Sequence, residues 1–122
     1  MSLPLASLIP EPGEVLTTGS LPRDRSLGLM PQSEDWRRAS AALATALDPQ
    51  GNGARVSWDN PESGAAGSIV AADAPYLEGD LVCRRFAATT RAGQSEESFA
   101  GHACRNGPGD WRIRSSERTV GS

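Results

Sequence analysis

Two cysteines and one histidine are the residues of this chain that could carry out covalent or metal chemistry. Cys83, His102 and Cys104 lie close together in the sequence. Thiolates and imidazoles are typical zinc ligands, but a structural zinc site needs four ligands, and these three side chains do not supply them. The sequence therefore predicts no metal site. The two thiols either form a disulfide or remain free and buried, as in a cytosolic protein.

The spacing of the two cysteines favours a disulfide. Gly93-Gln94 is typical of a two-residue type II′ turn, in which glycine comes first. Such a turn pairs Ala92 with Ser95, and the same register then pairs Cys83 with Cys104. The cysteines lie an odd number of positions from that hydrogen-bonded pair, so their side chains approach closely across the strands. We expect a cross-strand disulfide worth roughly 3 kcal/mol in a chain-entropy treatment.

Other side chains agree with this register. It places Arg91 opposite Glu96 and Phe86 opposite Gly101. It also gathers apolar residues on one face of the hairpin, namely Val82, Phe86, Ala88, Phe99 and Ala103. A persistent disulfide implies an oxidising compartment, so we expect the protein in the bacterial periplasm or at the cell surface.

Nothing in the sequence predicts an enzyme or a cofactor. His102 is the only histidine, and the register places it opposite Arg85 without a serine–histidine–acid arrangement. All 12 basic residues are arginine, which excludes catalytic and phosphate-loop lysines. Four acids near predicted turns lack the spacing of a calcium loop and are interpreted as turn residues: Asp59, Glu62, Asp80 and Asp110. A hydrolase stays an alternative if the fold brings His102 and two carboxylates into one cleft.

Tryptophan and arginine side chains are the candidates for a binding surface. Trp58 and Trp111 could form an aromatic platform, although their alternation with polar neighbours favours burial in the core. Arginines on neighbouring predicted strands could contact anionic lipid or polysaccharide, whereas the acids between them favour a solvated face. The candidate binding residues are Trp58, Trp111, Arg84, Arg85 and Arg112, and Arg105 and Arg114 lie on the same strands.

A helix is predicted to precede the strands that carry these residues. Ser33 can cap its N-terminus, and Glu34 and Asp35 suit the positive end of the helix dipole. Apolar residues then recur at spacings of three and four before the stop signal at residues 48–53. These residues are Trp36, Ala39, Leu43 and Leu47. We predict that the helix ends near Leu47.

Short alternating segments after the helix have the pattern of an antiparallel meander. We expect strands near residues 56–58, 68–72, 81–91, 95–105 and 111–114. The predicted fold class is α+β, with one N-terminal helix packed on a sheet of four or five antiparallel strands. The predicted domain covers residues 33–116 and is followed by a tail at 117–122.

Residues 1–32 are predicted to form a flexible tether. They contain more than half of the prolines and only isolated apolar residues, so no periodic apolar face can be drawn through them. The alternative is an extended arm that packs on the domain through Leu27, Leu29 and Met30.

Three sequence motifs, taken in order, resemble one bacterial family. The first motif, residues 56–68, contains a tryptophan, an asparagine-proline pair and two glycines. The second, residues 83–86, contains the first cysteine. The third, residues 101–105 with 109–113, contains the second cysteine and a closing tryptophan. The stretch from Glu34 to Arg114 is similar to the C-terminal domain of the 17-kilodalton surface antigen family. The resemblance implies a surface antigen of the cell envelope, typically an outer-membrane lipoprotein, of unknown general function.

Charge and hydropathy fit this implication. The net charge of −3 is spread along the chain, which does not predict nucleic-acid binding. The chain has neither a membrane-spanning run nor a glycine-zipper segment, and its start lacks the features of an intact signal peptide. We therefore expect that an export signal or a lipid-modified cysteine preceded Met1 and was removed.

The predicted function is non-catalytic, and the sequence allows two roles that differ in the partner bound. A binding or structural domain would contact another envelope protein or an outer-membrane component. Alternatively, a periplasmic inhibitor or accessory subunit of a larger envelope complex would use exposed loops, such as residues 61–67, or the proline-rich arm.

Overall fold

The helix α1 (Glu34–Leu47) has the predicted bounds. In the computed structural model, which describes residues 24–119, the side chain of Ser33 accepts a 3.1 Å hydrogen bond from the backbone N–H of Trp36. This cap satisfies one of the free donors at the helix N-terminus. The buried face consists largely of alanine, which lets the helix lie close to the sheet: Ala39, Ala42, Leu43, Ala46 and Leu47. No helix among the described residues has the length and apolar character needed to cross a membrane.

Ion pairs stabilise the first turn of α1. Glu34 accepts two hydrogen bonds from Arg37, at 2.7 and 2.6 Å, and one of 2.7 Å from Arg38. These hydrogen bonds lower the pKa of Glu34 to about 2, and the Glu34 carboxylate in turn raises the pKa of Arg37. Arg38 also donates a 2.9 Å hydrogen bond to the backbone carbonyl of Asp59, so the network ties the helix to the sheet.

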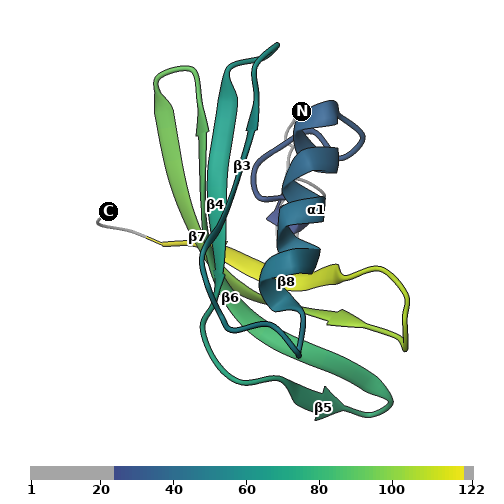
Figure 1. Cartoon of the computed structure of the whole chain (residues 1–122). Helices are drawn as coiled ribbons and strands as arrows, with labels where there is room; N and C mark the ends of the chain where they lie inside the picture. The colour runs from purple at the N-terminus through teal and green to yellow at the C-terminus, as the bar shows by residue number, and fades with distance from the viewer. Residues whose placement is uncertain (1–23, 120–122) are drawn as a thin grey trace, which may run out of the picture.

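The sheet is an antiparallel meander, as predicted, with one additional short strand (Figure 1). The strand order is β3-β4-β6-β7-β8, and β5 pairs with the first residues of β6. β5 has three exposed residues, which are too few to give a recognisable alternating pattern. β8 continues beyond the predicted end of the domain at residue 116. The strands are β3 (Val56–Asn60), β4 (Ala65–Ala71), β5 (Tyr76–Glu78), β6 (Leu81–Ala92), β7 (Ser95–Arg105) and β8 (Arg112–Arg118).

The β6–β7 hairpin has the predicted register. Ala92 pairs with Ser95, and Cys83 pairs with Cys104. Gly93 has a φ of +62°, the left-handed conformation that the first residue of a type II′ turn requires. Cys83 and Cys104 are joined by a disulfide, which confirms the pairing inferred from the sequence.

Residues 24–32 pack on the sheet and so differ from the tether predicted for residues 1–32. This segment opens with a short 3₁₀ helix, η1 (Asp24–Ser26). Leu27 and Leu29 are buried, whereas Met30 is 56% exposed. The hydroxyl of Thr90 donates a 2.9 Å hydrogen bond to the carbonyl of Leu27. Leu27 and Leu29 therefore pack on the domain, as the alternative of an extended arm requires. Residues 1–23 and 120–122 lie outside the described residues.

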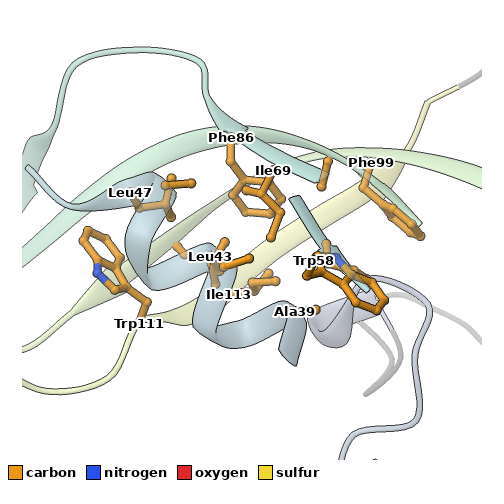
Figure 2. Packing of buried hydrophobic residues seen from close by; sticks show 14 of the residues in the cluster. Ala39, Leu43, Leu47, Trp58, Ile69, Phe86, Phe99, Trp111 and Ile113 are labelled. Carbon is orange, nitrogen blue, oxygen red and sulfur yellow. The ribbon is translucent and has the colours of Figure 1, made fainter. Parts of the chain in front are cut away.

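The core lies between α1, residues 24–30 and one face of the sheet. Figure 2 shows Leu43 and Leu47 directed toward Ile69 and Phe86, with Trp58 at the N-terminal end of the helix. Burial of large side chains against a close-packed helix is the main favourable contribution to the stability of such a domain. The fully buried large side chains include Phe86, Phe99, Leu27, Leu43, Leu47 and Ile69.

Gly101 provides a test of this packing. A Cβ atom at this position would collide with the backbone oxygen of Ser115 and would lie 2.7 Å from the Cα of Ser116. We expect Gly101→Ala to lower the free energy of unfolding by about 1 to 3 kcal/mol, because backbone atoms cannot move aside easily. Urea denaturation measures the change. The control is Ala100→Ser at the exposed neighbouring position, which should change stability by less than about 0.5 kcal/mol. Equal effects of the two substitutions would contradict the packing described.

The Glu34 network provides a test by pH. Because folding lowers the pKa of Glu34 from 4.5 to about 2, the ionised carboxylate stabilises the fold above pH 4.5, and this contribution is lost as the pH falls toward 2. Wild type should therefore be more stable than Glu34→Gln at neutral pH, and the difference should shrink between pH 4.5 and 2. Thermal unfolding in a series of buffers measures it. Removal of the donor in Arg37→Gln should reduce the same pH dependence, and a difference that stays constant throughout would contradict the network.

Candidate binding groove

An open groove lies between α1 and the start of β8. Its volume is about 560 Å³. The helix packs mainly on β3 and β4, which leaves the β8 side of the sheet less covered. Small side chains on the helix keep the groove open. The lining residues are Arg25, Trp36, Arg37, Ser40, Ala41 and Ala44 on one side and residues 110–113 on the other.

The groove concentrates positive charge. Arg25, Arg37 and Arg112 line it together with a single acid, Asp110. Arg37 is held at the rim by its ion pair with Glu34. Guanidinium groups arranged around a concave surface are suited to carboxylate and phosphate groups, which they can bind through paired hydrogen bonds.

Trp111 adds an aromatic wall and an unpaired hydrogen-bond donor. Its side chain lies beside the C-terminal part of α1, near Leu47 (Figure 2), and is 7% exposed. The guanidinium carbon of Arg105 lies 5.2 Å from the centre of the Trp111 ring, within the range of a cation–π interaction. The indole Nε1 is buried and has no hydrogen-bond partner. Such a donor is costly to leave unsatisfied, but because the atom is buried, a ligand in the groove would reach it only if neighbouring side chains moved.

The five residues predicted as a binding surface do not form one patch. Trp111 and Arg112 line the groove. Trp58 and Trp111 are each 7% exposed and belong to the buried core, as their alternation with polar neighbours indicated. Arg84 is also buried. Its guanidinium is satisfied by hydrogen bonds of 2.8 and 3.0 Å that it donates to the backbone carbonyls of Asp73 and Asp48. Arg85 is exposed and lines a separate hollow with His102.

Three residues of the groove were not identified from the sequence. Arg25 was assigned to the tether and Trp36 to the apolar stripe of the helix, whereas Arg37 carried no distinguishing signal. The partial burial of Trp36 is the detail that distinguishes it from the rest of the stripe. In the sequence, the sign that Trp36 could line a surface groove was its position at the edge of the apolar stripe of the helix.

The separate hollow contains His102 and two carboxylates. Its volume is about 300 Å³, and Asp73, Ser115 and Glu117 line it with the histidine. The Nδ1 of His102 lies 3.0 Å from the hydroxyl oxygen of Ser115. This is the combination that would favour a hydrolase. Among residues 24–119, however, neither carboxylate forms a hydrogen bond with His102. Oδ2 of Asp73 instead lies 4.0 Å from Nε of Arg85. The nucleophile–base–acid chain of a hydrolase is therefore not assembled.

Comparison with known proteins agrees with the motifs in the sequence. A family model described as the 17 kDa outer membrane surface antigen matches residues 45–112. The 17 kDa surface antigen of Rickettsia bellii is 26% identical over 87 residues, which cover 71% of this chain and 55% of that protein. The corresponding antigen of Rickettsia conorii is 28% identical over 80 residues, covering 66% and 50%. No solved structure gives a significant match.

The matched region contains strands β3 to β7 and residues 110–112 on the β8 side of the groove, whereas the groove residues on α1 and η1 precede it. It extends from the end of α1 through the disulfide hairpin to the first residue of β8. The chain spans about half the length of the curated relatives that it matches. Since the family model covers more than half of the chain, the protein belongs to the 17 kDa outer membrane surface antigen family.

Proposed function

We propose that this domain is a non-catalytic binding module of the bacterial envelope, and that the groove between α1 and β8 holds an anionic envelope component. Membership of the surface antigen family indicates an exported, envelope-associated protein. A position at the outer membrane or in the periplasm, with lipid anchoring upstream of Met1, is part of the proposal.

The observation that carries the proposal is the local excess of positive charge in the groove. The whole chain has a net charge of −3, yet three arginines and one acid line this cavity. Asp110 and the ion pair of Arg37 with Glu34 offset part of this charge, but a concave surface with more cations than anions still attracts anionic ligands. Phosphate and carboxylate groups are abundant on envelope polymers and lipids.

A second candidate, an inhibitor or accessory subunit of an envelope complex, is favoured by the position of β8. Among residues 24–119 this strand comes last in the strand order, and the last strand of a sheet is where an extended segment of another protein would pair. The groove opens beside its first residues. An acidic side chain of such a segment would meet the same arginines.

The proposal can be tested with purified lipopolysaccharide as an anionic envelope ligand. We expect the double substitution Arg37→Gln and Arg112→Gln to weaken binding by at least about tenfold, equivalent to about 1.4 kcal/mol, because two charged contacts are lost. Binding should also weaken with added salt. Fluorescence titration of the tryptophans measures the affinity.

The matched control removes the same charge from the other face of the sheet. Arg85→Gln with Arg91→Gln changes two exposed arginines that do not line the groove. This variant should bind like wild type. Equal losses in both double variants would show non-specific charge attraction and contradict the groove. A stoichiometric protein recovered from envelope extracts, and lost in the groove variant, would favour the accessory subunit.

A further inference from the structure

A carboxylate lies directly over the disulfide. Glu78 Oε1 is 3.6 Å from Sγ of Cys83 and 3.8 Å from Sγ of Cys104. β5 runs beside the start of β6 (Figure 1). It positions the carboxylate, because Tyr76 pairs with Cys83 and Glu78 follows two residues later on the same face. The sulfurs are buried, with Cys83 at 0% and Cys104 at 3% exposure, while Glu78 is exposed. The carboxylate therefore covers the sulfur pair from the solvent side.

Glu78 has no cationic partner that would explain its position. Among the described residues, none of the arginines forms an ion pair with it. A disulfide carries no thiol proton, so the sulfurs do not donate a hydrogen bond to the carboxylate. The carboxylate thus points at two sulfur atoms without gaining a hydrogen bond from them in the oxidised protein.

The three side chains are close enough to reach one metal ion once the bond between the two sulfurs is broken. Their donor atoms all lie within 4.8 Å of one another. Two thiolates and a carboxylate, with one water, complete the four-coordinate shell that Zn²⁺ prefers. We propose that reduction of the disulfide turns Glu78, Cys83 and Cys104 into a binding site for a thiophilic divalent cation such as Zn²⁺. The proposal is independent of the groove, which lies on the helix side of the sheet.

The electron and proton balance needs one reductant, a dithiol. Its two thiols become a disulfide, and the electrons and protons pass to Cys83 and Cys104, which become thiols. Zn²⁺ then replaces both thiol protons and is bound by the two thiolates. The same pair of side chains would hold β6 and β7 together through a covalent bond when oxidised and through a metal ion when reduced. This site could not be predicted from the sequence, because the three residues of β5 are too few to indicate a strand.

Cobalt titration of the reduced protein tests the proposal. The full chain is reduced without oxygen and titrated with Co²⁺, whose thiolate complexes absorb in the near ultraviolet. We expect one Co²⁺ per chain, displacement by Zn²⁺, and no signal from the oxidised protein. Glu78→Gln should weaken Co²⁺ binding at least about tenfold. The matched control, Asp80→Asn, removes an acid from the adjacent turn and should bind like wild type.

Circular dichroism recorded in parallel separates metal binding from folding. If the reduced chain loses structure, Co²⁺ or Zn²⁺ should restore it. Absence of a thiolate signal, failure of the metal to restore a lost fold, or unchanged affinity in Glu78→Gln would each overturn the proposal. Binding that persists in Cys83→Ser would also overturn it, because both thiolates are required.

Discussion

The register of the β6–β7 hairpin is the constraint on which the rest of the structure depends. β4 and β5 pair with β6, β8 pairs with β7, and β3 joins the sheet through β4. A slip by one residue would move Phe86 from the core to the solvent face. The turn at Gly93 fixes one end of the register, and the disulfide between Cys83 and Cys104 fixes the other. The same register therefore allows the two cysteines to form a disulfide and directs Phe86 into the core.

This hairpin also determines where the groove lies. It holds β3 and β4 on one side, where α1 packs, and β8 on the other, where the helix leaves part of the sheet uncovered. The alanines of α1 let the helix approach the sheet without filling the space beside β8. The groove that we propose as a binding site therefore depends on the arrangement of these elements.

The elements with strong local signals could be predicted from the sequence. The cap at Ser33, the apolar stripe of the helix and the glycine-first turn each specify a structure through neighbouring residues alone. Leu27 and Leu29 could not be placed, because isolated leucines become core residues only through contacts with distant strands. Arg84 could not be placed either, because the two carbonyls that satisfy it come from segments far away in the sequence. The groove was missed for the same reason, since its lining joins residues before, within and well after the helix.

The covalent state of the two cysteines in the exported protein tests the account most directly. Protein recovered from the bacterial envelope without reductant would be treated with an alkylating reagent, digested and analysed by mass spectrometry. The account predicts a cross-linked peptide that contains Cys83 and Cys104, with alkylation of both only after reduction. Alkylation of both cysteines in the untreated, folded protein would contradict it.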